Sequence, residues 1–506
     1  MIRRLLLFLS GALLPLRAAD TPPGWLCVGS PPFLKAAAPL IEQRRAQGLR
    51  VVVSSEPVEK AVADCVPPPA YILLLGDDCP GDAPDPASAW QVPAERQPYH
   101  GWLPKHPAEF ISDMIRGDFD KDGMPDACVG RIPARTAAEV AAGAAKILKW
   151  EKRKPSLNDL TVPVWAGDPG FAEVFRNMAL GFLFSQVRQR SPLWAELWVL
   201  QSDDRSPFCG WPVEQPSLFN SRLQTGGLVS AMIGHGQPRS WWCMDIAGQR
   251  LSYRVEDAAR MKKGAVCPPH VIFACSCGRF ALEKGDCLAE ALFRAPGGPV
   301  LCAAASEDSH PLTNYYHSSS MLESLNATAP RFGDLWLASL RKANATTEPE
   351  KELLVHALEP LMIKTSLSTA DLRKDHAAMY NIIGDPATRL FSPQKLEAGI
   401  SIKNGAWQWS VPHPPEDASL YVQVLPPLPQ FSLSKPAQGR AESLKNLADA
   451  NAKLRFQTIT RIPAGKPWTG TVPGPGTLRL VAVSNSALSV AASRMDEPET
   501  RTETRE

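Results

Sequence analysis

The chain carries almost no net charge, and this absence excludes one broad class of function. Its 506 residues include 54 lysines and arginines and 52 acidic residues, for a formal charge of +2. Because the two signs are mixed along the chain, the sequence gives no electrostatic case for nucleic-acid binding. Charged residues make up 21% and apolar residues 44% of the chain, as in globular proteins. At roughly 100 to 200 residues per domain, the length predicts two to four folded domains.

The chain also lacks an apolar run long enough to span a bilayer. Residues 5–16 are apolar over about a dozen positions, whereas a spanning helix needs about 20. This run follows Arg3 and Arg4 and precedes Ala18-Ala19, which is the pattern of a secretory signal peptide. We therefore predict a signal peptide at residues 1–19 and a mature protein that is secreted, periplasmic or at the cell surface, without a transmembrane helix. Association with the cell surface by other means stays open.

Cysteine is not scarce, and its odd number is informative. The chain has 11 cysteines, which in an exported protein permits several disulfides and leaves at least one thiol unpaired. Cys275 and Cys277 are separated by one residue, which is not the ligand spacing of a structural zinc site. We therefore expect a reactive thiol rather than a zinc centre.

Residues 25–393 alternate short apolar runs with amphipathic segments. The strand-like runs are apolar throughout, which predicts a mostly parallel sheet covered by helices on both faces. A capping box from Thr136 to Glu139 opens a helix, and Lys154-Pro155 after it marks a boundary between an N-terminal α/β subdomain, 20–153, and a second one, 154–394. Strands are expected at 25–29, 49–54, 71–75, 162–166, 228–234, 270–274 and 300–304, and helices at 33–47, 136–152, 171–189, 256–263, 286–294, 331–343, 351–361 and 370–380.

The pattern changes after Phe391. Short strand-like runs separated by proline and glycine turns predict a small β-sandwich at 395–490. Proline, at 49 residues about twice its usual share, is concentrated at 66–107 and 410–475, where loops and short edge strands are expected. The charged residues at 491–506 predict a disordered tail.

Two apolar strands end in residues that can carry chemistry. The run Leu-Val-Ser-Ala-Met-Ile-Gly-His-Gly at 228–236 brings His235 to the end of one strand, and the run beginning at His270 brings Cys275 to the end of another. Open α/β sheets bind ligands at the carboxyl ends of their strands, and the two ends can be neighbours after one crossover helix. A thiol beside an imidazole can supply a nucleophile and a proton donor. An inert buried cysteine and an ordinary Gly-His-Gly loop are the alternative interpretation.

Four blocks of the chain agree with one known family. They are Ile233-Gly-His-Gly236, Phe273-Ala-Cys-Ser-Cys-Gly278, the segment 118–135 that leads into the capped helix, and Tyr380-Asn-Ile-Ile-Gly-Asp-Pro386. These blocks resemble the gingipain-like cysteine peptidases, in the family's order over residues 25–392. The resemblance implies an α/β fold with a caspase-like parallel sheet flanked by helices in two subdomains, followed by an all-β Ig-like sandwich.

The same resemblance implies roles for single residues. His235 matches the family's general base and Cys275 its nucleophile, with Cys277 as a nearby competitor. Asp126 occupies the position of an acid that orients the histidine, although an aspartate is one methylene shorter. The thiolate attacks the scissile carbonyl, the imidazolium protonates the leaving amine, and the backbone N–H groups of Gly236 and Cys275 hold the oxyanion.

The walls of the substrate pocket are harder to predict. Trp241 and Trp242 follow the histidine loop, and Glu307, Asp308 and His310 follow the strand at 300–304. An acid in the pocket would favour arginine or lysine at the cleavage site, whereas most surface acids are simply solvated.

An aspartate-rich segment predicts a second kind of site. Asp118, Asp120, Asp122 and Asp126 match positions 1, 3, 5 and 9 of a calcium loop. Position 12 is Val129 instead of glutamate, so the segment is not an EF-hand, and an ordinary Asp/Gly turn is the alternative. The two roles of Asp126 compete, because a calcium ligand cannot easily serve His235.

The predicted function is an exported cysteine endopeptidase that acts on protein or peptide substrates through a Cys-His dyad and a thioester. It requires no cofactor, with calcium as a candidate structural ion. One alternative is a sortase-like transpeptidase of the same family, which passes the acyl group to an amine. The other is a catalytically inactive surface-binding protein.

Overall fold

The computed structural model describes residues 22–78, 91–103, 105–168, 189–264, 267–349 and 368–495. The expected signal peptide and the helix at 351–361 lie outside these residues, as does almost all of the helix at 171–189. Of the expected tail at 491–506, residues 496–506 also lie outside, whereas 491–495 belong to a strand that the prediction did not include. Within the described ranges, no helix has the length and apolarity to cross a membrane.

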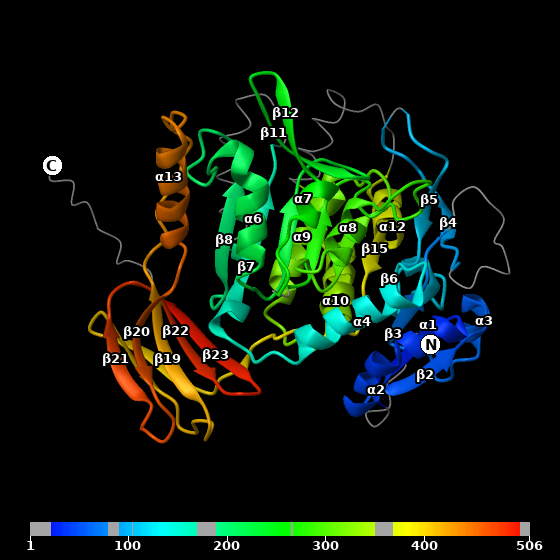
Figure 1. Ribbon diagram of the computed structural model, residues 1–506. Helices are drawn as coiled ribbons and strands as arrows, with labels where there is room; N and C mark the ends of the chain where they lie inside the picture. The colour runs from blue at the N-terminus through cyan, green and yellow to red at the C-terminus, as the bar shows by residue number, and fades with distance from the viewer. Residues whose placement is uncertain are drawn as a thin grey trace, which may run out of the picture.

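A ten-stranded sheet forms the centre of the molecule (Figure 1). Eight of its nine strand pairings are parallel, and β14 with β15 is the antiparallel one. The prediction of a mostly parallel sheet is therefore confirmed, and the two expected subdomains share one continuous sheet. In spatial order the strands are β2 (Arg50–Ser54), β1 (Gly24–Gly29), β3 (Tyr71–Leu75), β6 (Cys128–Ile132), β15 (Tyr380–Ile383), β14 (Cys302–Ala305), β13 (His270–Phe273), β9 (Ser230–Ile233), β7 (Thr161–Ala166) and β8 (Glu196–Gln201).

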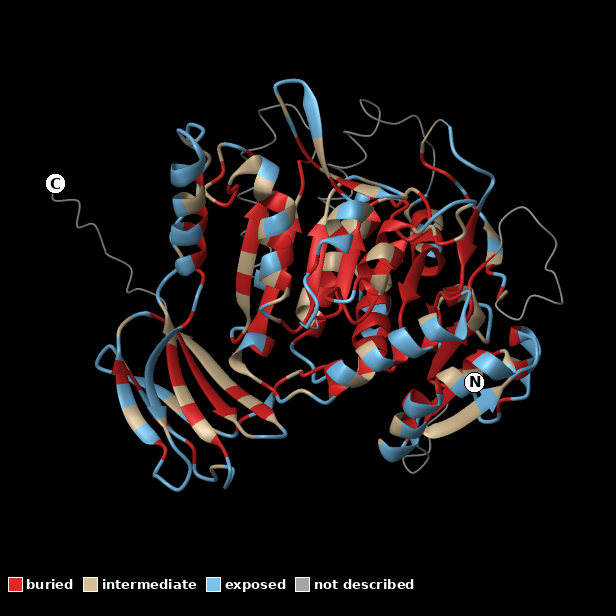
Figure 2. Cartoon of the chain, in the orientation of Figure 1, coloured by how far each residue is buried: buried red, intermediate tan, exposed pale blue. Residues whose placement is uncertain are grey.

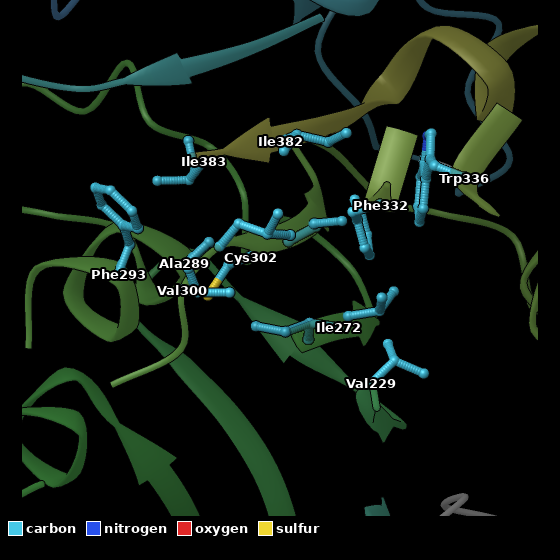
Figure 3. Close-up of a cluster of buried hydrophobic side chains, with 14 of the residues drawn as sticks. Val229, Ile272, Ala289, Phe293, Val300, Cys302, Phe332, Trp336, Ile382 and Ile383 are labelled. Atoms are coloured by element: carbon cyan, nitrogen blue, oxygen red, sulfur yellow. The ribbon is translucent and has the colours of Figure 1, made fainter. Parts of the chain in front are cut away.

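Helices cover both faces of this sheet. Ile382 and Ile383 are successive residues of β15, so their side chains point to opposite faces. Figure 3 shows Phe332 and Trp336 near the former and Phe293 near the latter, and all five side chains are buried. The helices concerned are α10 (Phe332–Ala345) and α8 (Leu288–Arg294). Apolar packing on both faces explains why these strands read as continuous hydrophobic runs.

The start of helix α4 (Ala137–Glu151) agrees with the prediction from its sequence. The Thr136 hydroxyl accepts from the Glu139 amide at 3.3 Å, and the Glu139 carboxylate accepts in return from the Thr136 amide. Both bonds satisfy amides that have no partner inside the helix. The capping box therefore fixes where α4 begins.

Some elements were not predicted, and the polar ones among them lack an apolar period. Helix α9 (Pro311–Ser324) buries polar side chains such as Thr313, His317 and Ser320, so no apolar face marks it. Strand β8, helix α6 (Gln215–Leu223) and the hairpin of β11 (Ser240–Ile246) and β12 (Gln249–Arg254) were also missed. Burial of polar groups that bond one another gives no hydrophobic signal in a sequence.

A buried ion cluster joins the N-terminal strands to the end of β15. Asp385 accepts from Trp25 Nε1 at 3.1 Å and from Arg44 Nη2 at 2.7 Å, and Arg44 Nη1 lies 2.8 Å from Glu151. The side chains of all three ionised residues are at most 1% exposed. The Gly-Asp-Pro block thus holds three distant segments together and does not contribute to the strand ends that carry His235 and Cys275.

The C-terminal region contains two sheets that share a core. A five-stranded sheet has the order β16 (Gln394–Lys395), β23 (Leu488–Met495), β22 (Gly476–Val483), β19 and β20. A three-stranded sheet has the order β17 (Gly399–Lys403), β18 (Ala406–Ser410) and β21 (Thr469–Pro473). Trp407, Trp409 and Trp468 pack between them with Leu420 and Leu480. The expected strands are therefore present, but the insertion of helix α13 (Arg440–Ala452) between β19 (Ser419–Leu425) and β20 (Gln457–Ile462) was not predicted.

Helix α13 lies along the edge strand β8 of the central sheet (Figure 1). Asn451 makes two bonds to this edge: its Oδ1 accepts from the Val199 amide at 2.8 Å, and its Nδ2 donates to the Val199 carbonyl at 2.9 Å. Phe431 also packs on Phe208, with ring centroids 4.9 Å apart. A side-chain amide thus takes the place of a further strand at this position.

The cysteines in the described part of the chain form none of the disulfides that the sequence permitted. None of the ten described cysteines is bonded to another, and nine of them are buried. Cys79 lies outside the described residues. Burial in apolar surroundings explains their number without disulfides, because a free cysteine behaves as a small hydrophobic residue.

Candidate active site

Strands β9 and β13 are neighbours and end at the same edge of the sheet. Ile233 pairs with Phe273, and the Gly234 amide continues the ladder with a bond of 3.1 Å to the Phe273 carbonyl. His235 and Cys275 each follow directly. The structure therefore brings together the two residues that the sequence singled out.

Gly236 lies in close contact with the cysteine loop. A Cβ atom on this residue would lie 2.4 Å from the Cys275 carbonyl oxygen and 2.6 Å from Cys277 Sγ. Real Cβ atoms do not approach other atoms so closely, so only glycine fits here. This approach places the backbone of the histidine loop against the backbone of Cys275.

The imidazole of His235 is exposed and lies beside an indole ring. Its centroid is 5.1 Å from that of Trp242, with 33° between the ring planes. The His235 carbonyl accepts from the Trp242 amide at 2.9 Å, which fixes the turn between the two residues. The histidine is thus held at the carboxyl end of β9, on the surface, where a substrate can reach it.

The thiol of Cys275 is partly buried and protonated at rest. Its Sγ–H donates to the Ser309 carbonyl at 3.7 Å. Burial, together with the nearby Asp308 carboxylate, raises the pKa of this thiol to about 12. Ser276 has a positive φ of 56°, so a sharp turn follows the cysteine. Attack on a carbonyl therefore needs a base to remove the proton.

Cys277 is not equivalent to Cys275. It is fully buried, and its Sγ contacts the carbonyls of Gln237 and Ser240 at 3.5 and 3.8 Å. Burial also raises the pKa of its thiol, with a further contribution from Cys275. A substrate carbonyl cannot reach a fully buried sulfur, so the structure favours Cys275 over its competitor.

Two aromatic residues that were not predicted hold the segment behind Cys275. Tyr99 Oη and Trp102 Nε1 both donate to the Asp308 carbonyl, at 2.6 and 2.7 Å. The next carbonyl, that of Ser309, is the one that accepts from Cys275. No signal in the sequence linked residues 99–102 to the site, because they lie in a proline-rich loop far from it along the chain.

The structure corrects the assignment of Asp126. This residue lies before β6, which β15, β14 and β13 separate from β9. Four strand spacings amount to about 19 Å, too far for a carboxylate to orient His235. Its Oδ2 instead accepts from the Phe119 amide at 3.0 Å. The spacing along the chain gave no information on strand order.

A different aspartate lies next to the histidine loop. Asp168 follows β7, the strand beside β9, and its side chain is buried. Its amide donates to the Cys243 carbonyl at 2.8 Å, and the preceding Gly167 amide donates to the Ile233 carbonyl at 2.9 Å. The signal that could have found it is an aspartate two residues after a parallel strand.

The sequence profile of peptidase family C25 matches residues 18–391. The chain belongs to this family. It is therefore a cysteine-type endopeptidase. A search of curated protein sequences finds no match.

Solved structures show the same fold as this C25 peptidase. The crystal structure of the Arg-specific cysteine proteinase gingipain R matches with a TM-score of 0.52 and 14% sequence identity, over 93% of this chain and 98% of that chain. A complex of the pro- and mature domains of RgpB from Porphyromonas gingivalis matches with a TM-score of 0.51 and 14% identity, over 93% of this chain and 99% of that chain. The predicted gingipain-like, caspase-like α/β fold is confirmed.

Two of the predicted pocket walls in this C25 peptidase cannot contact a substrate. Trp241 is fully buried against Trp165, with ring centroids 4.7 Å apart. Glu307 is 4% exposed and paired with Arg279, so it is not a free acid that could select a basic side chain. Both corrections arise from side-chain direction, which the sequence did not resolve.

Two other predicted walls do reach the site. Trp242 lies beside His235, and Asp308 is partly exposed next to Cys275. The Ser276 hydroxyl donates to Asp308 Oδ1 at 3.4 Å. His310 is buried, with its ring 5.0 Å from that of Trp102, so it supports the loop rather than lining a surface.

The aspartate-rich loop brings three of its four predicted ligands together. Carboxylate oxygens of Asp118, Asp120 and Asp126 lie within 4.8 Å of one another. Asp122 is not part of this group, and its Oδ1 accepts from the Met124 amide at 2.7 Å. Asp118 Oδ1 is buried without a hydrogen-bond partner. The donor set of carboxylate oxygens fits a hard divalent cation such as calcium.

Proposed function

We propose that the protein hydrolyses peptide bonds with Cys275 as nucleophile and His235 as general base and acid. The observation that supports this proposal is the register of β9 and β13, which ends both strands at one edge with the two residues beside each other. His235 removes the Sγ proton as sulfur attacks the scissile carbonyl carbon. The imidazolium then protonates the leaving amine, and water hydrolyses the thioester.

The surroundings of the dyad support the same steps. The glycine at 236 lets its backbone approach Cys275, so its N–H and that of Cys275 are candidates to hold the oxyanion. Asp168 is the nearest strand-end acid on the other side of β9, and we assign it the orientation of His235 in place of Asp126. The high pKa of the resting thiol implies that proton removal accompanies attack rather than preceding it.

The experiment is cleavage of a diverse peptide library by the mature protein under mild reductant. Cys275→Ala and His235→Ala are expected to lower kcat/KM by at least about 1,000-fold, because the two groups act as a unit. Cys277→Ala is the matched control, and it should retain activity if it folds. Retained cleavage by Cys275→Ala would contradict the assignment. An added amine in the same assay measures whether transfer competes with hydrolysis.

A structural calcium ion at Asp118, Asp120 and Asp126 is part of this proposal. Burial, with Asp122 and Asp120 nearby, raises the pKa of Asp118. A cation that neutralises these carboxylates would therefore stabilise the loop. Calcium should raise the thermal midpoint of the wild type, and Asp118→Asn should remove most of this shift. Asp122→Asn is the matched control, because Asp122 lies outside the group.

We also propose that the protein is exported and that its C-terminal region is an Ig-like sandwich. Export is supported by the signal pattern at residues 1–19. The sandwich is supported by the two facing sheets around Trp407 and Trp409. Cell fractionation and the N-terminal sequence of the mature protein test the first point.

A further inference from the structure

A pocket opens beside the histidine loop, against the β11–β12 hairpin. Figure 1 shows where this hairpin projects from the molecule. It has a volume of about 390 Å³. Gln237, two residues after His235, lines it, and so do Arg239, Arg250 and Arg254. Three guanidinium groups therefore surround a cavity that begins next to the proposed catalytic base.

The pairing of the hairpin sets the direction of Arg254. Trp241 and Tyr253 are opposite each other and are both fully buried. Side chains alternate along a strand, so the neighbouring pair of Ser240 and Arg254 points away from the core. Figure 2 shows the outer part of this hairpin as exposed. Arg254 therefore faces the pocket and solvent as a consequence of strand register.

The arginines that line the pocket can bind an anion, because none of them is held in a strong ion pair by a residue that the structure describes. Within the described part of the chain, the Arg254 guanidinium forms no hydrogen bond or ion pair; only its backbone amide does, to Asp257. Arg250 pairs with Asp245 at 3.3 Å, but both side chains are about half exposed, so this pair exchanges readily. Arg239 donates to a backbone carbonyl. Glu256 is the one acid that lines the pocket.

A stack of side chains connects the pocket to His235. The centroids of the His235 and Trp242 rings lie 5.1 Å apart. The Arg250 guanidinium lies over the same indole, 4.0 Å from its centroid. At ~3.3 Å per residue, an extended peptide covers the distance from His235 across Trp242 to Arg250 in about three residues. His235 protonates the leaving amine, so the peptide that passes it is the part that departs with the new amino terminus.

We propose that this pocket is a subsite for an acidic side chain on the leaving side of the scissile bond, within three residues of it. Arg254 is the primary contact and Arg250 the second, because a guanidinium can bind a carboxylate through two parallel hydrogen bonds. This proposal rests on the proposed function. It concerns selectivity among substrates and leaves the chemical step to Cys275 and His235.

The test is cleavage of a peptide library derived from whole-cell protein, with sequencing of the new amino termini. Wild type should show aspartate or glutamate enriched roughly five-fold over asparagine or glutamine in the first three positions, at low salt. Arg254→Gln should bring this ratio close to one, and Arg254→Glu should shift the preference toward lysine. Arg260→Gln is the matched control, since Arg260 is exposed nearby, pairs with Asp257 and does not line the pocket.

A binding measurement separates failure of the subsite from failure of the proposed function. The Cys275→Ala protein is titrated with labelled Glu-Glu-Gly-Gly and Gln-Gln-Gly-Gly peptides, and tighter binding of the former that Arg254→Gln abolishes is expected. Absence of any cleavage by the wild type would count against the proposed function, and this titration would still decide the subsite. Equal binding of the two peptides, or cleavage without acidic enrichment, would overturn the subsite.

Discussion

At the scale of single residues, the site depends on one position that has no side chain. Gly236 follows His235, and its backbone lies against the Cys275 carbonyl and Cys277 Sγ. The atoms it would meet belong partly to backbone, which cannot rotate away. The distance between the histidine and cysteine loops is therefore set by this residue.

We predict that Gly236→Ala lowers kcat/KM by about 100-fold, because a displacement of about 1 Å is enough to misalign a nucleophile and its base. The measurement is steady-state cleavage of one peptide, together with a far-ultraviolet spectrum that reports folding. Gly399→Ala, in the C-terminal strand β17 (Gly399–Lys403), is the control, because Gly399 has no positive φ and a Cβ there would meet only the Ser410 hydroxyl, at 3.3 Å. Equal activity of the two variants would contradict the role of Gly236.

The sequence identified some site residues and missed others for a clear reason. His235 and Cys275 were identified because each ends an apolar run, and strand ends of a parallel sheet converge. Asp126 was placed wrongly and Tyr99 was missed, because their positions depend on strand order and on a loop that crosses the sheet edge. Neither is a local property of the sequence.

At the scale of elements, the edge of the central sheet is completed by a helix. The backbone groups of Val199 on β8 are satisfied by the Asn451 side chain of α13, and Val199 is 2% exposed. An unpaired edge is a site for pairing with other chains. Helix α13 therefore protects the catalytic sheet as well as joining the C-terminal sheets to it.

We predict that Asn451→Ala lowers the free energy of unfolding by about 1–3 kcal/mol, because it leaves a buried amide and carbonyl without partners. The measurement is chemical denaturation, with light scattering to detect association through β8. Asn326→Ala is the control, since Asn326 is exposed and bonds only to its own helix end. A loss as small as that of the control would show that water satisfies Val199 equally well.

A second prediction at this scale concerns the buried ion cluster of Arg44, Glu151 and Asp385. Arg44→Met removes one partner and leaves Asp385 and Glu151 buried, which should cost about 3–5 kcal/mol of stability. Arg45→Met is the control: Arg45 is the next residue of α2 (Ala38–Ala46), and its partner Glu42 is exposed, so little change is expected. Denaturant midpoints of the two variants give the comparison. If Arg44→Met were as stable as wild type, the cluster would not hold the segments together.

At the scale of the whole molecule, much of the order of strands and helices follows from the sequence, but their packing does not. The continuous apolar runs predicted β1, β3, β7, β9 and β13, because strands buried on both faces have no polar positions. The polar helix α9 and the short helix α6 carry no such pattern. The reversal of direction between β14 and β15 also has no local signal, since it follows from where a strand returns to the sheet.

The buried histidines predict how the stability of the whole fold depends on pH. His270, His317 and His376 are buried in the neutral form, and His317 Nδ1 and His376 Nε2 lie 3.0 Å apart. Burial lowers the pKa of His270 and of His317 to about 3, and burial with the neighbouring histidines lowers that of His376. In the unfolded chain these groups take up protons near pH 6.5. Their contribution to stability is therefore present above pH 6.5 and is lost as the pH falls below it.

Buried carboxyls oppose this trend, and Glu290 has the largest shift in pKa among them. Burial, with Asp77 nearby, raises the pKa of Glu290 to about 8, so its contribution is present at low pH and is lost as the pH rises through 8. Three histidines against Glu290 leave a net uptake on unfolding that rises toward two protons as the pH falls from about 6.5 to 5, and each proton changes the free energy of unfolding by ~1.4 kcal/mol per pH unit. We predict a fall of about 2–3 kcal/mol per pH unit over this range, measured by denaturation at several pH values.

His317→Gln should reduce the slope by about a third to a half, and His413→Gln, at an exposed position, should not change it. A stability that stays constant from pH 6.5 to 5 would mean that the buried histidines take up protons in the folded state.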